Sequence, residues 1–340
     1  MRYKLLGKSG LRVSELALGT MTFGEDWGWG ASREVSQQIF EAYANAGGNF
    51  VDTANNYTNG TSEKFVGEFI HSDRHHFVVA TKFTLSERPS DPNFGGNQRK
   101  NMMRSVEGSL KRLNTEFIDL LWLHAWDGLT PVEEVLRGLD DLVRSGKVNY
   151  IGISDSPAWV VSQANAVADL RGWSSFVALQ LPYSLSGRDP ERDLLPMAQA
   201  HQMSVTAWGI LGGGALTGKY NTASDDPKRY SDAGEKQKQL AQLVMQVAER
   251  NGRSPAQVAI NWIRQQQAKS SLIPILGART VAQIADNLAC LEWQLTDEEL
   301  AQLSDASPIA LGFPHEFLAR DEVRRLIFGD TFALIDNHRA

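Results

Sequence analysis

The sequence has one cysteine and no long apolar run. Cys290 is the single cysteine among 340 residues, which excludes an intramolecular disulfide and a zinc site built on cysteine ligands. No stretch of 18 consecutive apolar residues occurs, and residues 1–11 lack the continuous apolar core of an export signal. We therefore expect neither a membrane span nor export, and a reducing cytoplasm is the expected location.

The sequence also lacks an excess of basic residues. It has 34 Lys and Arg against 40 Asp and Glu, a formal net charge of -6, which is the wrong sign for a dedicated nucleic-acid-binding protein. Its 42% hydrophobic and 22% charged residues are close to the average of soluble globular proteins, so collagenous, disordered and coiled-coil classes are excluded. His71, His75 and His76 have no matching carboxylate cluster, and we expect no metal site.

Short apolar runs rich in β-branched residues alternate with longer stretches of helical periodicity. This alternation is typical of repeated βα units around a parallel sheet, and eight evenly spaced units favour a closed (β/α)8 TIM barrel. The expected strands are Leu16–Gly19, Asn49–Asp52, Phe77–Lys82, Phe117–Leu123, Tyr150–Ser154, Val177–Gln180, Ser204–Ala207 and Ser271–Ile275. Because Pro274 lacks the backbone donor of a central strand, we expect the last strand to be short.

A doubly wound sheet is the competing architecture, and it needs a G-x-G-x-x-G turn after an early strand. The sequence contains no such turn: Gly28-Trp29-Gly30 is nearest, but Arg33 stands where the last glycine belongs. No repeat, low-complexity tract or linker is found, so one domain over residues 1–340 is expected. The segments 85–98 and 221–239 are expected to be loops on the active-site side of the barrel.

Several expected helices begin with a residue that can cap the free backbone N–H groups. Thr130 with Glu133, Thr280 with Gln283 and Thr296 with Glu299 have the spacing of capping boxes, with Pro131 at a first helical position and Ser254 preceding Pro255. These starts agree with the strand and helix alternation.

Polar residues end four of the apolar strands. Asp52, Lys82, His124 and Gln180 stand where a barrel strand meets the active-site mouth, and Tyr57 follows on the loop after Asp52. A lysine cation stabilises tyrosinate, so Lys82 is expected to move the pKa of Tyr57 from about 10 towards neutrality while Asp52 compensates the lysine charge. Each residue alone has an ordinary structural explanation, but together they predict a general-acid site.

At these residues the sequence resembles the aldo-keto reductase superfamily, whose second strand ends in Asp-Thr-Ala-x-x-Tyr before a Gly-x-Ser-Glu helix start. Here the motifs are Asp52–Tyr57 and Gly60–Glu63, followed by Gly67. The resemblance runs from a hairpin-like start at Tyr3 to about Leu291. It implies a (β/α)8 barrel core over about residues 15–291, an N-terminal β-hairpin and a C-terminal tail, residues 292–340, over the barrel.

The resemblance also implies a reaction. Aldehydes or ketones would be reduced to alcohols by hydride transfer from a nicotinamide cofactor bound without a Rossmann motif, and the partner would be a small carbonyl or alcohol substrate. On the family's mechanism, Tyr57 would protonate the carbonyl oxygen, Lys82 and Asp52 would lower the tyrosine pKa, and His124 would orient the carbonyl.

NADPH is the implied cofactor, with NADH less favoured. Gln180 would bind the nicotinamide carboxamide, Trp208 would stack on its ring, and the glycine-rich run 209–219 allows close backbone approach to a pyrophosphate. Arg279, at a helix start with free N–H groups, suits the 2′-phosphate. The expected cofactor residues are Thr20, Met21, Asp52, Ser154, Asp155, Gln180, Trp208, Gly209, Ile210, Leu211, Gly212, Gly213, Gly214, Lys219, Arg229, Gly277, Arg279, Gln283, Asp286 and Asn287.

Two positions depart from the family's pattern. Asp155 stands where the family usually has Asn, and Asp286 where it often has Glu. An ionised Asp155 accepts a hydrogen bond from the carboxamide NH₂ but cannot donate to its oxygen, so cofactor affinity or orientation is expected to differ. Neither departure removes a catalytic group.

Aromatic residues gather at the expected mouth of the barrel. Trp27 and Trp29 follow the first strand and Trp126 lies just past His124, which together with Tyr57 predict an apolar substrate pocket. The phenylalanines of the tail would either cover this pocket or pack on the barrel.

Two alternatives stay open. The same site permits an NADP-dependent alcohol or sugar dehydrogenase, by microscopic reversibility. Some superfamily members are instead cofactor-sensing regulatory subunits of potassium channels, and they share the spacing of Trp208, Lys219 and Arg229 found here. Those subunits tend to carry Asn at the position of His124, which favours an enzyme. The oligomeric state and the physiological substrate are not indicated.

Overall fold

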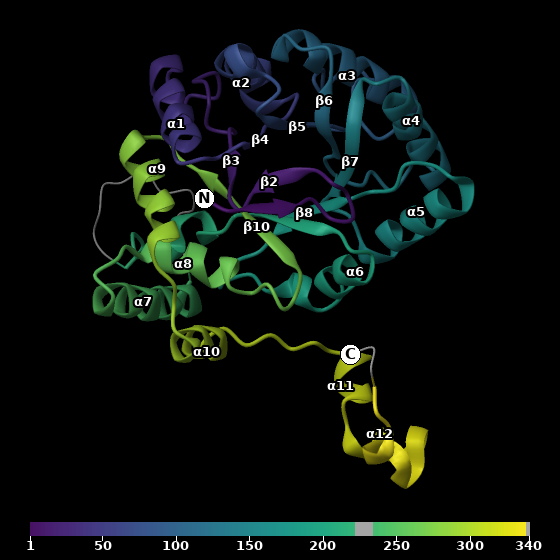
Figure 1. Cartoon of the computed structure of the whole chain (residues 1–340), viewed down its shortest axis with the longest axis vertical. Helices are drawn as coiled ribbons and strands as arrows, with labels where there is room; N and C mark the ends of the chain where they lie inside the picture. Colours follow the sequence, from purple (N-terminus) through teal and green to yellow (C-terminus); the bar gives the residue numbers. More distant parts are fainter. Residues whose placement is uncertain (222–233, 338–340) are drawn as a thin grey trace.

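The structure is a computed structural model that describes residues 1–221 and 234–337. Eight parallel strands close into a barrel in the order β10-β3-β4-β5-β6-β7-β8-β9 (Figure 1). Their bounds are β3 (Ala17–Gly19), β4 (Phe50–Asp52), β5 (Val78–Phe83), β6 (Ile118–Leu123), β7 (Val148–Ser154), β8 (Ala178–Pro182), β9 (Ser204–Trp208) and β10 (Ser271–Gly277). Each overlaps an expected strand, so the predicted (β/α)8 barrel is confirmed.

Helices surround the barrel, and most of them bury one face while α8 is buried on all sides. They are α1 (Arg33–Asn45), α2 (Thr61–Ile70), α3 (Arg99–Leu113), α4 (Val132–Arg144), α5 (Ala158–Arg171), α6 (Leu194–Ala200), α7 (Glu235–Arg250), α8 (Pro255–Arg264) and α9 (Val281–Leu288). On α4, Val135, Leu139 and Leu142 are buried at helical spacing while Glu133 and Arg137 face solvent. Within the described ranges, no helix is long and apolar enough to cross a membrane.

An antiparallel hairpin closes the amino-terminal end of the barrel. It consists of β1 (Tyr3–Leu5) and β2 (Arg12–Ser14). Leu6 and Val13 are completely buried in the same cluster as Trp122 of the barrel interior. Gly7 is required here, because a Cβ atom at this position would lie 2.0 Å from the backbone oxygen of Val177 and its φ is +56°. The end where the strands finish is therefore the open one.

The strand register brings the polar strand ends together. Gly19 pairs with Asp52, Asp52 with Ala80, and Gln180 with both Ser154 and Thr206. Because every strand runs in the same direction, the last residues of neighbouring strands lie at one rim of the barrel.

The last strand is not short as expected. β10 has seven residues and includes Pro274, which pairs with Ala207 of β9. On its other side β10 pairs with β3, and this pairing begins only at Ile275. Pro274 therefore has no partner residue on β3, and its lack of a backbone N–H removes no hydrogen bond between these two strands.

The helix starts agree in part with the expected caps. Thr296 and Glu299 form a complete capping box, and Ser254 caps α8. Thr280 caps α9, but the Gln283 side chain accepts from Arg279 and not from Thr280. The expected cap at Thr130 is wrong, because its hydroxyl donates to Asp127 and Pro131 takes the cap position without a side-chain hydrogen bond. Residues 235–239, expected in a loop, belong to α7.

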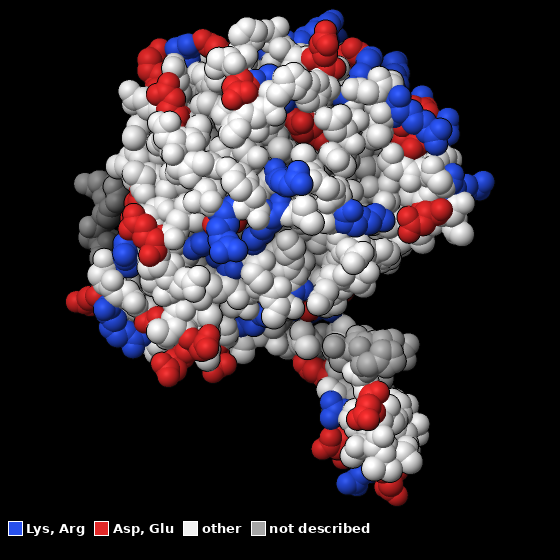
Figure 2. Space-filling view, viewed as in Figure 1, with Lys and Arg blue, Asp and Glu red and all other residues white. Residues whose placement is uncertain are grey.

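The C-terminal tail does not lie over the barrel. After α10 (Asp297–Asp305), which packs on α7, the helices α11 (His315–Leu318) and α12 (Asp321–Phe328) stand away from the barrel (Figure 1). The phenylalanines expected to cover the barrel contact one another instead: Phe313 with Phe317 at a ring-centroid distance of 6.0 Å, and Phe328 with Phe332 at 5.1 Å. Figure 2 shows charges of both signs on this projecting segment. One domain over residues 1–340 stays a prediction.

Candidate active site

Lys82 and Asp52 form a buried ion pair at the open end of the barrel. Lys82 Nζ lies 2.5 Å from Asp52 Oδ2 and also donates to the backbone oxygen of Thr53 at 2.8 Å. The other Asp52 oxygen accepts from Gln180 Nε2 at 3.0 Å. Burial alone would lower the pKa of Lys82, but the Asp52 carboxylate and Tyr57 raise it above its ordinary value. The ammonium group therefore stays charged.

Tyr57 is placed by a strained turn that follows β4. It begins the 3₁₀-helix Tyr57–Gly60, in which Thr58 has a φ of 45°, in the left-handed region that few residues other than glycine adopt. The Thr58 hydroxyl holds this turn by donating to the backbone oxygen of Phe23 at 2.7 Å. As a result the Tyr57 ring lies next to Lys82, whose Nζ is 4.8 Å from the ring centroid.

The pKa of Tyr57 lies above its ordinary value. Burial is the main cause; Lys82 opposes it, while the Asp52 carboxylate adds to the increase. The expected movement of the Tyr57 pKa towards neutrality is therefore not found, because the paired aspartate offsets the lysine charge and burial outweighs what remains. Tyr57 stays a protonated phenol, which is the form that a general acid needs.

His124 follows β6 and lies edge-on to Tyr57, with ring centroids 6.0 Å apart and an interplanar angle of 80°. Burial and the Lys82 cation lower the pKa of His124 to about 3, so the imidazole is neutral at physiological pH. Its Nδ1 atom is buried and has no hydrogen-bond partner among the described residues. A neutral imidazole keeps one N–H group, which can donate to a carbonyl oxygen.

A cavity of about 480 Å³ opens above these groups at the carboxyl ends of the strands. Lys82 lies below its surface and is completely buried. The expected residues that line this cavity are Met21, Trp27, Asp52, Tyr57, His124, Asp155, Gln180, Trp208, Gly209, Ile210, Leu211, Gly213, Gly214, Gly277 and Asn287. The structure therefore brings the four expected catalytic residues and most of the expected cofactor residues to one place.

A second cavity, of about 640 Å³, continues from the first towards the N-terminus of α9. The two share the lining residues Met21, Thr22, Gly213, Gly214 and Gly277. The second also reaches Trp29, Lys219, Arg279 and Gln283. Together they form one groove, which we call the rim groove, that runs from Tyr57 and His124 to Arg279.

Besides the fully buried Lys82, five of the expected residues that the structure describes do not line the rim groove. The Thr20 hydroxyl is buried against the Asp52 backbone oxygen at 3.0 Å, and Asp286 accepts from Ser254 and Gln257 at 2.7 Å each. Ser154, Gly212 and Trp126 are likewise absent from the lining. The Asp286 carboxylate faces α8 because a donor near the start of that helix binds each of its two oxygens. Arg229 lies outside the described residues.

Some lining residues were not expected from the sequence. They include Thr22, Asn56, Leu85 and Ala278, each of which lies in a loop after a strand. Thr22 joins two of these loops, because its hydroxyl donates to the backbone oxygen of Ala278 at 2.6 Å. Their positions in the sequence could have predicted them, because each residue follows the end of an expected strand by only a few residues.

Asp155 has an unusual backbone conformation, with a φ of 39°. Asp and Asn adopt this left-handed region more readily than other side chains, which gives a physical reason for either of them at this position. Asp155 accepts from Trp208 Nε1 at 3.3 Å. Desolvation by the surrounding protein raises the pKa of the Asp155 carboxyl group. The hydrogen bond from Trp208 and the positive charge of Lys82 oppose that increase only in part.

The fold and the cluster at its mouth define a (β/α)8-barrel enzyme. The chain belongs to the aldo/keto reductase family, whose sequence profile matches residues 15–308. The chain is 38% identical over 320 residues to a norsolorinic acid reductase of Emericella nidulans, covering 91% of this chain and 82% of that protein. It is 36% identical over 350 residues to a protein of Phanerodontia chrysosporium named aryl-alcohol dehydrogenase [NADP(+)], covering 94% of this chain and 87% of that protein.

A further relative is an aryl-alcohol dehydrogenase of Pestalotiopsis microspora, 35% identical over 329 residues, covering 93% of this chain and 85% of that protein. The family and these names show an oxidoreductase that acts on carbonyl or alcohol groups. None of these three relatives is named as a sensor, whereas two of them are named as dehydrogenases.

Proposed function

We propose that the protein reduces aldehydes or ketones with NADPH, and that Tyr57 is the general acid. The observation that carries the proposal is the contact between the buried Lys82–Asp52 pair and the Tyr57 ring, beside a neutral His124 in an apolar cavity. A protonated phenol next to a fixed cation is a proton donor whose conjugate base is stabilised in place.

The rim groove fits a dinucleotide phosphate cofactor. Gly213 and Gly214, which line the groove, have φ of 65° and 88°, so the chain turns sharply there without side chains that would obstruct a pyrophosphate. Near the other end, Arg279 lies just before α9 and makes no side-chain hydrogen bond with a described residue, so its guanidinium is available for a 2′-phosphate.

The end near Tyr57 fits the nicotinamide. Gln180 lines the cavity there, and Trp208 is 39% exposed at the end of β9. In the same cavity the buried His124 Nδ1 has no hydrogen-bond partner among the described residues, as is expected where a ligand completes the hydrogen bonding. When bound, NADPH supplies the hydride that reduces the carbonyl carbon.

The side chains of this protein would then handle the proton. A carbonyl oxygen in the cavity accepts the Tyr57 hydroxyl proton, and the remaining tyrosinate is stabilised by Lys82, whose charge is already in place. The neutral His124 donates a hydrogen bond to the same oxygen and fixes its direction. For alcohol oxidation the proton moves the opposite way, from the alcohol to the tyrosinate.

The mouth of the cavity indicates an aromatic substrate. Trp27 packs on Trp29 with ring centroids 5.6 Å apart and edge-on to Tyr57 at 6.4 Å, and Leu85 lines the same cavity. A flat apolar substrate would gain both burial and ring contacts there. The relatives named for aryl alcohols and for norsolorinic acid agree with this class. Alcohol oxidation with NADP⁺ is the second candidate, favoured by the dehydrogenase names.

The test is NADPH consumption over a panel of aromatic, aliphatic and sugar aldehydes, with Tyr57→Phe in parallel. The wild type should reduce aromatic aldehydes best, and the variant should bind NADPH with unchanged affinity but lose reduction by at least about a hundredfold. Equal rates for wild type and Tyr57→Phe would contradict the assignment. NADPH binding without turnover on any carbonyl or, with NADP⁺, any alcohol would contradict the proposed function itself. A cytoplasmic location stays a prediction.

A further inference from the structure

We propose that Thr84 is a positioning residue for His124 and acts through its hydroxyl group. The proposal rests on the proposed function, because it concerns the placement of the expected donor. Thr84 directly follows β5 and is buried, and its φ is 110°. A β-branched residue rarely adopts such a φ, and the conformation persists only where the surrounding structure holds it.

The Thr84 hydroxyl connects two loops at the mouth of the barrel. It donates to Asn97 Oδ1 at 2.8 Å and accepts from the backbone N–H of His124 at 3.3 Å. That N–H also donates to the backbone oxygen of Phe83 at 3.2 Å. The imidazole of His124 has no hydrogen bond with a described residue, so its position depends on the backbone that carries it. The Thr84 hydroxyl is one of two acceptors that fix this backbone.

Asn97 is fixed in turn by Asp127, in the loop after His124. The Asn97 backbone N–H donates to Asp127 Oδ2 at 2.7 Å, and Oδ1 accepts from the N–H groups of Leu129 and Thr130 at 2.9 Å each. Partial burial raises the pKa of Asp127, but these donors outweigh it and keep the pKa below its ordinary value. Thr84, Asn97 and the ionised Asp127 therefore tie together the loops on both sides of His124.

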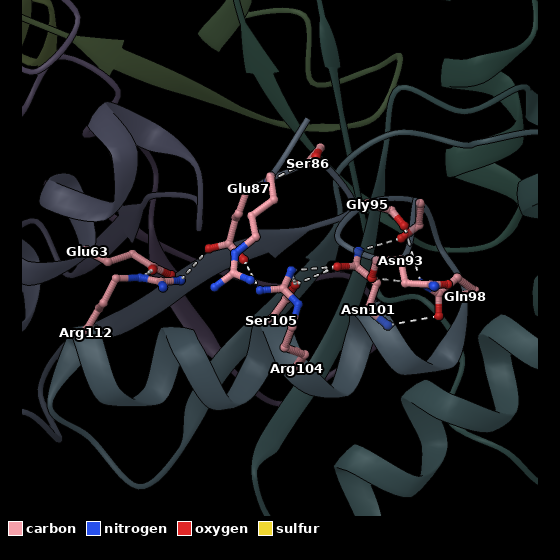
Figure 3. A network of polar contacts seen from close by, with 12 residues as sticks. Glu63, Ser86, Glu87, Asn93, Gly95, Gln98, Asn101, Arg104, Ser105 and Arg112 are labelled. Carbon is pink, nitrogen blue, oxygen red and sulfur yellow. Dashed lines mark hydrogen bonds and ion pairs between the residues drawn. The ribbon is translucent and has the colours of Figure 1, made fainter. Parts of the chain in front are cut away.

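The loop that carries Asn97 is itself anchored on α3 (Figure 3). Glu87 pairs with Arg104 at 2.5 Å and with Arg112 at 3.4 Å, while Gln98 caps α3 by accepting from the Asn101 N–H at 2.9 Å. Arg112 also pairs with a completely buried glutamate, Glu63, at 2.6 Å (Figure 3). Because the two ion pairs of Glu87 and the Gln98 cap hold this loop on α3, loss of the Thr84 hydroxyl is expected to move His124 rather than the loop.

The experiment compares three substitutions at Thr84 with a control. Thr84→Val keeps the shape and removes the hydroxyl, Thr84→Ser keeps the hydroxyl, and Thr84→Gly removes both the hydroxyl and the strain. Thr115→Val is the matched control, because the Thr115 hydroxyl also donates one hydrogen bond, to the Phe117 backbone oxygen at 3.3 Å, and accepts one, from Arg74 Nε at 2.9 Å. Thr115 precedes β6, whereas His124 follows it, so the two lie at opposite ends of this strand. The measurements are kcat, KM, melting temperature and the imidazole resonances of His124 in protein labelled at histidine, assigned with His124→Asn.

We expect Thr84→Val to shift the His124 resonances and to lower kcat by about tenfold or more, with the KM for NADPH changed less than about twofold. Thr84→Ser should restore both. Thr84→Gly should lower kcat and shift His124 without lowering the melting temperature, a combination that a purely structural threonine does not predict. The control should leave His124 unshifted.

Unshifted His124 resonances in both Thr84→Val and Thr84→Gly would overturn the proposal. The resonances report on His124 without any substrate, so they decide the matter even where the wild type reduces no carbonyl. In that case the proposed function fails, while a shift confined to the variants that lack the hydroxyl still supports the role of Thr84.

Discussion

Lys82 Nζ lies 2.5 Å from Asp52 Oδ2, and the two side chains are 0% and 5% exposed. A pair this deeply buried is costly to form, but removing one partner costs more, because the other charge is then buried without a partner. The pair as a whole carries no net charge, yet it places the positively charged Lys82 ammonium group next to the Tyr57 ring. Both the stability of the barrel mouth and the chemistry of Tyr57 therefore depend on it.

Asp52→Ala should destabilise the protein by roughly 3–5 kcal/mol, because Lys82 loses its counter-charge. The double variant Asp52→Ala with Lys82→Met should recover much of that stability without recovering activity. Urea unfolding at pH 7 measures both. Single and double variants of equal stability would show that the unpaired lysine is not what destabilises the protein.

The pKa of His124, lowered to about 3 by burial and Lys82, predicts a loss of stability in acid. An unfolded histidine has a pKa near 6.5, so below that pH the unfolded chain binds a proton that the native protein does not. Stability should therefore fall as the pH drops from about 6.5 towards 3, and His124→Asn should lose this component. Urea unfolding at pH 7 and pH 5 makes the comparison.

The same pKa predicts how activity responds to pH. Since His124 is neutral throughout the range, kcat should show no step from its titration between pH 5 and pH 8. A step near pH 6.5 that disappears in His124→Asn would mean that His124 is protonated in the working enzyme.

Arg279→Ala should weaken NADPH binding by about tenfold to a hundredfold and leave NADH binding nearly unchanged, because only NADPH has a phosphate for a charge-assisted hydrogen bond. Fluorescence titration with each cofactor measures this. Arg171→Ala, at the C-terminal end of α5, is the control for loss of a surface charge. Equal loss for both cofactors would show that Arg279 does not contact the 2′-phosphate.

Truncation after Ala310 should leave the melting temperature within about 2 °C of that of the full chain. Of residues 311–337 only Val323 is buried, while Phe313 and Leu326 are 85% and 84% exposed, so the barrel loses little packing. Truncation after Thr296 is the contrast, since it also removes the buried Leu303 and the Ser304 backbone oxygen that accepts from Arg188 at 2.7 Å. Calorimetry measures the melting temperature of both truncated proteins. A large decrease for the truncation after Ala310 would mean that the tail packs on the barrel.

The positions of the proposed catalytic residues were predictable because they follow from barrel geometry. Asp52 and His124 each follow an apolar strand, and parallel strands in a closed barrel leave no choice about where their ends meet. The raised pKa of Tyr57 was not predictable, because the sequence does not show how deeply the side chain is buried. Nor does it show that Asp52 Oδ2 lies only 2.5 Å from Lys82 Nζ and so offsets the lysine charge.

Other features depend on contacts between segments far apart in the chain. Asp286 accepts hydrogen bonds from Ser254 and Gln257 at the start of a different helix, so its position in the sequence after β10 does not place its carboxylate in the rim groove. Thr84 gave no signal, because its φ follows from hydrogen bonds to Asn97 and His124 that form only in the folded protein. The phenylalanines of the tail are apolar enough to cover a barrel, but composition does not say which surface they contact.

The hairpin that closes the amino-terminal end of the barrel affects which parts of the sequence can change between relatives. Leu6 and Val13 seal that end, and the apolar cluster inside the barrel that they belong to contains no residue of the rim loops. Insertions and substitutions in those loops can accumulate while the lysine, aspartate, tyrosine and histidine stay in place. Relatives that share more than a third of their residues with this chain can thus keep the same barrel and act on different substrates, as the names norsolorinic acid reductase and aryl-alcohol dehydrogenase illustrate.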